Sequence, residues 1–155
     1  MRSASALFNS ANLAGVTGSV PRMSQSFSPA ARDVFAKNAL AHVASLGSDG
    51  EPHVTPVWCE LEGDLIVINT ALGRAKARNL ANDARVAISL TDPDNPYSVI
   101  AVRGKVVAFT TDGADEVINR LAKKYLGLDE YPYRREGEIR VTVKIEPERI
   151  AQQPN

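Results

Sequence analysis

The sequence predicts an α+β protein that is mainly β, with six mainly antiparallel strands closing into a small barrel beside short flanking helices. Two observations predict this class. Short apolar or alternating segments, bounded by Gly, Pro, Asp and Asn, recur between helical segments, and some of these segments are apolar on both faces. A closed sheet covers both faces of such strands and leaves no exposed edge.

Composition limits the function classes. The chain has 155 residues, 44% of them hydrophobic, with 18 basic and 18 acidic residues, which suits one domain with a substantial core. Zero net charge and a pI near 6.7 argue against general binding to nucleic acid or to an anionic membrane. No apolar run reaches the roughly 18 residues of a membrane span. We therefore expect no nucleic-acid partner and no membrane partner.

The single cysteine, Cys59, excludes an internal disulfide and a cysteine-rich zinc site. His42 and His53 lack metal-ligand spacing, so no metal site is expected. A reducing, cytoplasmic location fits this cysteine usage best. Cys59 itself is expected to be a small hydrophobic residue of the core.

The chain divides into three parts by composition. Residues 1–27 contain no acidic residue and show no folding pattern, so we expect a disordered tail, with an organelle transit peptide as a less favoured alternative. Met23 could be an alternative start. Residues 28–150 are expected to form one domain, and residues 151–155 a C-terminal tail.

Helical signals appear at three places. Ser28 can cap a helix that begins at Pro29, with Val34 and Phe35 facing inward. The stretch Leu72–Asp83 has helical spacing of its apolar residues, and a third helix is predicted to end at a glycine. The helices are expected within Pro29–Ala39, Leu72–Asp83 and Asp112–Gly127.

Strand signals fill the rest of the domain. The Asp49-Gly50 pair predicts a hairpin turn between the first two strands. Gly104 interrupts a long apolar segment and predicts a bend or bulge. The six expected strands are Leu40–Gly47, Pro52–Leu61, Asp64–Thr70, Ala84–Asp92, Val99–Thr110 and Glu138–Ile150, of which the third and fourth are apolar on both faces.

Three cations crowd the first two turns of the second helix. Arg74, Lys76 and Arg78 lie where the helix dipole disfavours positive charge and where unpaired N–H groups favour an anion. In isolation such residues usually form a solvated face. The alternative is that they bind a negatively charged ligand.

The segments "SDGEPHVTPVWCELEGDLIVINTALGRAKARNLANDARVAISL" and "DPDNPYSVIAVRGKVV" resemble the split β-barrel superfamily of pyridoxamine 5'-phosphate oxidase, and more closely its deazaflavin (coenzyme F420) dependent branch. The resemblance runs from about Phe35 to Pro147. It implies a split barrel of the flavin-reductase or FMN-binding type. It also implies a homodimer that holds a flavin-type cofactor at the subunit interface.

The resemblance implies a set of cofactor-binding residues and leaves the catalytic residues unknown. The basic helix would bind the cofactor phosphate, one strand would run beside the ring, another would reach the ribityl chain, and a loop would approach from the partner subunit. In that order the residues are Arg74, Lys76 and, as a weaker candidate, Asn79; Thr55, Pro56 and Val57; Asn69 and Thr70; and Tyr97 and Ser98.

The chain departs from the oxidases of the superfamily. Thr55 and Glu60 stand where those enzymes carry an Arg and a Lys, and their Arg-rich C-terminal motif is missing. We therefore expect no oxidation of vitamin B6 phosphates. The leading hypothesis is an F420-dependent oxidoreductase that transfers hydride to a small unsaturated or conjugated molecule. The alternatives are an FMN-binding oxidoreductase of the same fold and a non-catalytic carrier of F420 or a flavin.

Several residues keep two interpretations. Trp58 and Tyr97 are either core or rim aromatics or ring-stacking residues. The loop Tyr131–Arg135 is either a substrate lid or an ordinary exposed loop. His53 could face the core or the cleft.

Overall fold

The computed structural model describes residues 26–152, so Met23 and most of the predicted N-terminal tail lie outside the described residues. The sequence forms three helices and a single sheet in this part of the chain. In chain order the elements are α1 (Pro29–Ala36), β1 (Ala41–Leu46), β2 (Pro52–Val57), β3 (Cys59–Glu62), β4 (Leu65–Ala71), α2 (Ala75–Asn82), β5 (Arg85–Asp92), β6 (Asn95–Thr110), α3 (Ala114–Leu126) and β7 (Arg140–Gln152).

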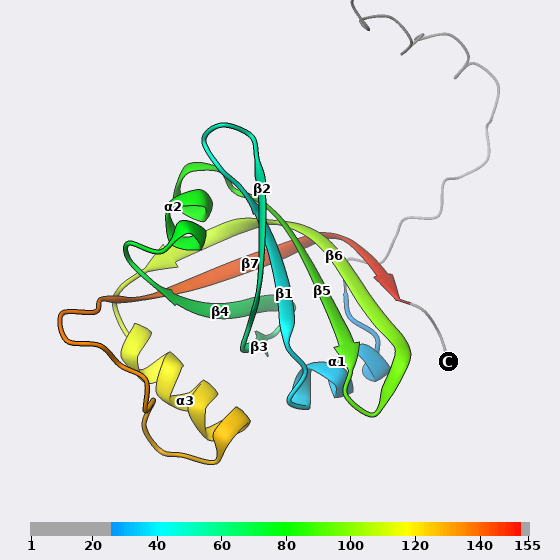
Figure 1. Cartoon of the computed structure of the whole chain (residues 1–155). Helices are drawn as coiled ribbons and strands as arrows, with labels where there is room; N and C mark the ends of the chain where they lie inside the picture. Colours follow the sequence, from blue (N-terminus) through cyan, green and yellow to red (C-terminus); the bar gives the residue numbers. More distant parts are fainter. Residues whose placement is uncertain (1–25, 153–155) are drawn as a thin grey trace, which may run out of the picture.

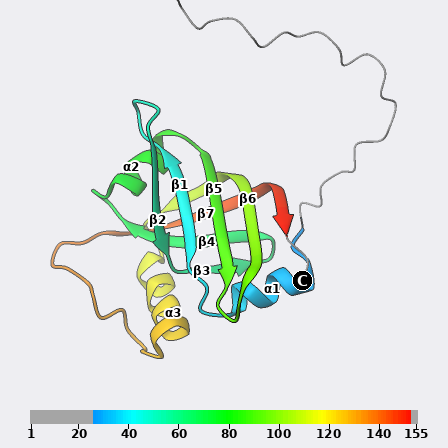
Figure 2. The same cartoon turned by 45° about the vertical axis from the view of Figure 1, so that its right-hand side comes forward.

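The sheet is antiparallel at every pairing and has the strand order β2-β1-β5-β6-β7-β4-β3. It curls strongly, so that β1 and β2 cross in front of β4 and β7 (Figures 1 and 2). The strands at its two edges, β2 and β3, follow each other directly in the chain. This half-barrel is consistent with the predicted split barrel.

The strand count differs from the prediction, since the sheet has seven strands and not six. The segment predicted as one strand, Pro52–Leu61, is divided at Trp58 into β2 and β3. β2 pairs with β1, whereas β3 pairs with β4 at the other end of the sheet order. Pro52 and Pro56 suit β2 because an edge strand tolerates residues without an N–H donor.

Helix α1 begins as the sequence predicts. Ser28 is its N-cap and accepts a hydrogen bond from a backbone N–H three residues later at 3.1 Å, and Pro29 follows it. Val34 and Phe35 are buried. Phe27 is also buried, with its ring centroid 4.9 Å from that of Phe35, so packing begins within the segment predicted to be a tail.

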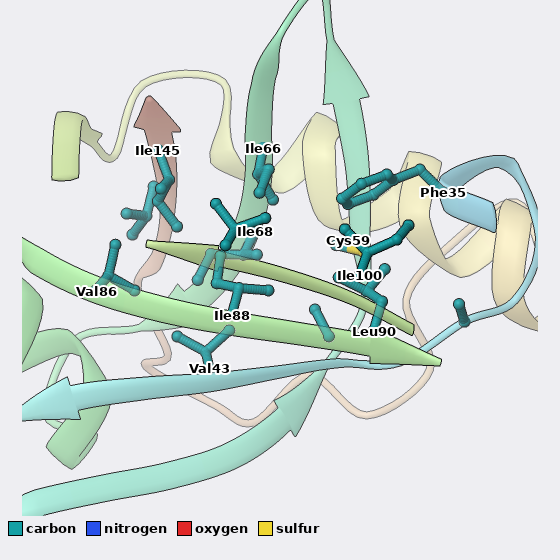
Figure 3. Close-up of a cluster of buried hydrophobic side chains, with 14 of the residues drawn as sticks. Phe35, Val43, Cys59, Ile66, Ile68, Val86, Ile88, Leu90, Ile100 and Ile145 are labelled. Carbon is teal, nitrogen blue, oxygen red and sulfur yellow. The ribbon is translucent and has the colours of Figure 1, made fainter. Parts of the chain in front are cut away.

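The core lies inside the curled sheet, between β4, β5, β6 and β7 (Figure 3). β4 is buried almost throughout, which confirms that both of its faces are covered. β5 differs from the prediction because only one face is buried: Val86, Ile88 and Leu90 point into the core while Ala87 is exposed. Helix α3 packs on β4 and β7, whereas α1 contacts β5.

The bend predicted at Gly104 is confirmed. The register of β6 against β7 shifts between Arg103 and Gly104. A Cβ atom at Gly104 would lie 2.5 Å from the backbone oxygen of Glu146, so the two strands approach too closely there for any side chain. The described helices include none that is long and apolar enough to cross a membrane.

Candidate functional site

A buried lysine marks the start of α2. β4 ends at Ala71, the chain turns through Gly73 at φ 90°, and Arg74 is the N-cap residue of the helix. Lys76 in the first turn is only 7% exposed, and it makes no hydrogen bond or ion pair with the residues that the structure describes. Burial, together with the positive charges of Arg74 and Arg140, lowers the Lys76 pKa to about 8. These three residues are called the cation cluster below.

Arg140 enters the cluster from the first residue of β7. Its side chain is 2% exposed, its Nε donates to Asn69 Oδ1 at 2.8 Å, and its guanidinium lies 5.0 Å from the centroid of the Tyr131 ring. Its Nη1 donates to Glu138 Oε1 at 2.8 Å. Arg140 therefore has a fixed orientation in a buried position.

Arg140 is not among the residues predicted from the sequence to bind the cofactor. From this residue onward the strand alternates Arg-Val-Thr-Val, which places Arg140 and Thr142 on one face and Val141 and Val143 on the other. All of these residues are buried, so Arg140 is a charge on a strand with two covered faces. A charged residue at the start of such a strand was the available signal.

A cavity of about 250 Å³ lies beside the cluster. Four residues predicted to bind cofactor line it, together with Trp58 and Arg140. Those four come from three different parts of the chain: Pro56 and Val57 from β2, Asn69 from β4, and Arg74 from the start of α2.

Aromatic side chains form the apolar wall of this cavity. Trp58 stacks on Tyr125 with ring centroids 5.3 Å apart, and the edge of Tyr131 meets Trp58 at 5.9 Å. Tyr133 packs edge-on against Tyr131 at 5.7 Å. The backbone N–H of Tyr131 also donates to Asn119 Oδ1 at 2.9 Å, so α3 anchors this loop, which supplies two aromatic rings to the cavity. A flat, largely apolar group fits such a wall.

Three buried polar atoms among the described residues have no hydrogen-bond partner: His53 Nδ1, Thr55 Oγ1 and Thr70 Oγ1. His53 and Thr55 lie opposite Ser45 and Val43 of β1, both of which are buried, so their side chains face the inside of the sheet. An unpaired buried polar atom costs about 1 to 3 kcal/mol. His53 and Thr55 lie on β2 and Thr70 on β4, and none of the three is among the residues that line the cavity.

The other predicted residues lie outside the cavity. Asn79 Nδ2 donates to Ser45 Oγ at 3.2 Å, which ties α2 to β1. Tyr97 and Ser98 lie at the start of β6, and Tyr97 is 79% exposed. Arg78 turns back and donates to the backbone oxygen of Gly73. Of the three cations noted in the sequence, only Arg74 and Lys76 therefore belong to the cluster.

The donor set favours an organic anion over a metal. In the part of the chain that the structure describes, no group of three or more His, Cys, Asp or Glu side chains could hold a metal ion. Cys59 is fully buried, and burial raises the pKa of its thiol. The cavity instead combines two arginines with aromatic rings, and Lys76, which does not line the cavity itself, adds a third positive charge close to those arginines. This combination fits a cofactor with a phosphate and a planar ring.

Comparison with solved structures finds the same fold in several proteins. An F420 reductase superimposes with a TM-score of 0.69 at 27% sequence identity, over 79% of this chain and 96% of that protein. A conserved hypothetical protein from Mycobacterium tuberculosis gives a TM-score of 0.62 at 24% identity, over 85% and 86% of the two chains. A putative pyridoxamine 5'-phosphate oxidase from Listeria innocua gives 0.57 at 16% identity, over 75% and 89%.

Among curated proteins, no sequence matches this chain significantly. The family model described as pyridoxamine 5'-phosphate oxidase matches residues 27–154, which is most of the chain and includes every strand and helix of the fold. Together with the split half-barrel, this match assigns the family: the chain belongs to the pyridoxamine 5'-phosphate oxidase family.

Proposed function

We propose that this protein is an F420-dependent oxidoreductase that reduces a small unsaturated or conjugated organic molecule, and that the cation cluster holds the phosphate of the cofactor. One observation carries the proposal: Lys76 is buried beside Arg74 and Arg140 and has no acidic partner of its own among the described residues. Membership of the family and the likeness to an F420 reductase support an oxidoreductase of this kind.

A phosphate fits the cluster on electrostatic grounds. Burying the Lys76 ammonium in the field of two guanidinium groups is unfavourable, and the attraction of a bound anion offsets both the desolvation cost and the repulsion. The Thr70 hydroxyl has no hydrogen-bond partner among the described residues, but Thr70 pairs with Val141, on the face of the β4–β7 ladder opposite to Asn69 and Arg140, so we do not assign it to the phosphate. Asn69 has a different role, because its Oδ1 and Nδ2 already bind Arg140 and the backbone oxygen of Ala114 at 2.8 Å each. We assign Asn69 to positioning Arg140.

The ring of the cofactor is assigned to the aromatic side of the cavity. Pro56, Val57 and Trp58 line it, and their apolar surfaces would cover a planar ring and exclude water from it. When bound, a reduced deazaflavin supplies hydride chemistry, so the protein has to supply binding and orientation. This division of roles explains why the chain needs no catalytic dyad or triad.

We also propose that the protein is a homodimer. The outer face of β1, β5 and β6 carries small side chains, including Ala44, Ala87 and Ala101, and shallow hollows that a second sheet could fill. Tyr97 and Ser98 would then approach the cofactor site of the partner subunit. Ala87→Glu places a charge on this face and should convert a dimer into a monomer in light scattering after gel filtration. A wild-type protein that is monomeric at micromolar concentration would refute the shared site.

The binding experiment titrates purified protein with F420 and with FMN, following fluorescence. Lys76→Ala removes a charge-assisted contact and should weaken F420 binding by about 10- to 150-fold, which is roughly 1.5 to 3 kcal/mol. Added salt should weaken wild-type binding more than binding by this variant. Lys105→Ala is the matched control, since Lys105 is an exposed cation of β6 outside the cluster. Equal affinity of the wild type and Lys76→Ala for F420 would refute the proposed phosphate site.

Two further measurements rank the alternatives. Stoichiometric FMN retained through purification would favour an FMN-binding oxidoreductase of the same fold. Reduced F420 should be oxidised when enones or quinones are added, and binding without oxidation across a broad panel would favour a carrier.

A further inference from the structure

A buried carboxylate bridges two members of the cation cluster. Glu138 has a side chain that is 7% exposed, and it lies two residues before Arg140 at the end of the loop that carries the aromatic residues. Its Oε1 accepts from Arg140 Nη1 at 2.8 Å, and its Oε2 accepts from Arg74 Nη2 at 3.4 Å. Its negative charge is thus placed where the phosphate is expected to bind.

We propose that Glu138 sets the charge selectivity of the anion site, opposing a phosphate monoester with two negative charges more strongly than a phosphodiester with one. This inference rests on the proposed function, since it assumes that the ligand phosphate lies at the cation cluster. Its physical basis is that the Coulomb repulsion between Glu138 and the ligand is proportional to the ligand charge. The factor by which Glu138 lowers affinity for a dianion is therefore about the square of its factor for a monoanion.

The surrounding contacts hold Glu138 in place. Two guanidinium groups donate charge-assisted hydrogen bonds to its two carboxylate oxygens. Arg140 is held independently through Nε by Asn69, so its position does not depend on Glu138 alone. Lys76 differs from both arginines because it has no contact with Glu138 among the interactions described. Glu138 therefore offsets the arginine charges and leaves the lysine uncompensated.

This selectivity would distinguish FMN from F420 by the charge of their phosphate groups. The terminal phosphate of FMN is a monoester, which is dianionic above its second pKa of about 6. The phosphate of F420 is a diester and carries one charge, with its further negative groups along the tail. With Lys76 protonated, the four side chains Arg74, Lys76, Arg140 and Glu138 sum to a formal charge of +2, and removal of the carboxylate charge would raise this to +3.

The test compares FMN with its phosphate monomethyl ester, which share ring and ribityl chain and differ by one charge. Both are titrated at pH 7.5 against the wild type and Glu138→Gln, a substitution that keeps the size and hydrogen-bonding capacity of the side chain. We expect the variant to bind the ester about 10-fold more tightly and FMN about 100-fold more tightly, so that selectivity shifts about 10-fold toward the monoester. F420, as a diester, should follow the ester.

Two further variants isolate the effect. Glu136→Gln removes one negative charge from an exposed position of the same loop and should leave the ratio of the two affinities unchanged. Glu138→Ala removes the charge without the amide and should reproduce the shift in the ratio, which keeps the test valid if Glu138→Gln does not fold.

Each outcome has a defined meaning. Equal gains for FMN and its ester in Glu138→Gln, or losses for both, would show that Glu138 only positions the arginines, and would overturn the selectivity. Binding that is sensitive to Lys76→Ala with an unchanged ratio would refute this inference and leave the phosphate site standing. Binding that is insensitive to Lys76→Ala would refute the phosphate site and this inference together.

Discussion

Replacing Lys76 with Met should stabilise the cofactor-free protein at neutral pH, although the same change removes a residue proposed to bind the cofactor. Met keeps the length and apolar stem of Lys76 and lacks its charge, so it fills the same buried space without the desolvation cost. It also removes the repulsion from Arg74 and Arg140, which lower the Lys76 pKa in the folded protein. A gain in stability from losing a functional residue is the usual trade-off at binding sites.

The magnitude follows from the pKa. A fall from the ordinary value of 10.5 to about 8 disfavours the charged form in the folded protein. At about 1.4 kcal/mol for each pKa unit, this corresponds to roughly 3.5 kcal/mol. Relaxation and solvent screening reduce the expected gain to about 1 to 3 kcal/mol.

The sign of the pH dependence is opposite to that of an ion-paired lysine. The folded-state pKa of Lys76 lies below its unfolded value, so the cost is fully present below pH 8 and disappears as the pH rises from about 8 to 10.5. The wild type should therefore gain stability relative to Lys76→Met across that interval. The advantage of the variant should be largest near pH 7 and nearly absent near pH 10.5.

Urea unfolding of both proteins at pH 7, 8, 9 and 10 measures this difference, provided that both remain two-state. Other groups with altered pKa values, such as Lys124 and Tyr125, are present in both proteins and cancel in the difference. Lys105→Met serves as the control for loss of an exposed charge. A variant that is less stable than the wild type at pH 7, or an advantage that does not shrink with pH, would refute the uncompensated state of Lys76.

Two further predictions concern the frame of the site. Gly104→Ala should destabilise the protein by about 1 to 3 kcal/mol in urea unfolding, because its Cβ would lie 2.5 Å from the backbone oxygen of Glu146; an unchanged midpoint would contradict this. Tyr125→Phe should cost about 1 to 3 kcal/mol, because the hydroxyl accepts from the Cys59 N–H at 3.1 Å and donates to the Ala39 carbonyl. A Tyr125→Phe variant with the same melting temperature as the wild type would show that water replaces both hydrogen bonds of the hydroxyl.

Local features of the fold could be predicted because neighbouring residues decide them. The Ser28 cap needs only a side chain that reaches a backbone N–H three residues on. Gly50 adopts a φ of 82° in the predicted hairpin turn, a conformation that glycine enters without strain. The bulge at Gly104 was likewise visible as a glycine inside an apolar strand.

The predictions that were wrong concern features that depend on residues distant in the sequence. The break at Trp58 exists because the chain leaves β1 and joins β4, and neither partner is evident from the segment Pro52–Leu61 alone. Ala87 looked buried because its neighbours are apolar, yet the outer face of β5 lies away from α3. In α2, the apolar residue Ala81 is exposed whereas the charged residue Lys76 is buried.

The residues of the candidate site could likewise be predicted only where neighbours in the sequence decide their position. Arg74 and Lys76 could be named because they lie together on one short helix with an anomalous charge at its start. Arg140 showed only the signal of a charge at the start of an apolar strand, and its position beside that helix, like that of Glu138, follows from the pairing of Ala71 with Arg140 in the β4–β7 ladder. In the sequence, an arginine near a glutamate has the appearance of an ordinary surface ion pair.

The fold compensates the three positive charges of the cation cluster to different extents. We expect an anion to gain most of its binding free energy at the charge that is compensated least. Arg140 has Asn69, Glu138 and the Tyr131 ring, and Arg74 has Glu138 and an exposed fraction of 48%. Lys76 has neither a partner among the described residues nor much solvent. Because the folded protein leaves this one charge uncompensated, an anion that reaches Lys76 recovers free energy that the fold alone does not. The loss of affinity in Lys76→Ala and the gain of stability in Lys76→Met should therefore have the same origin.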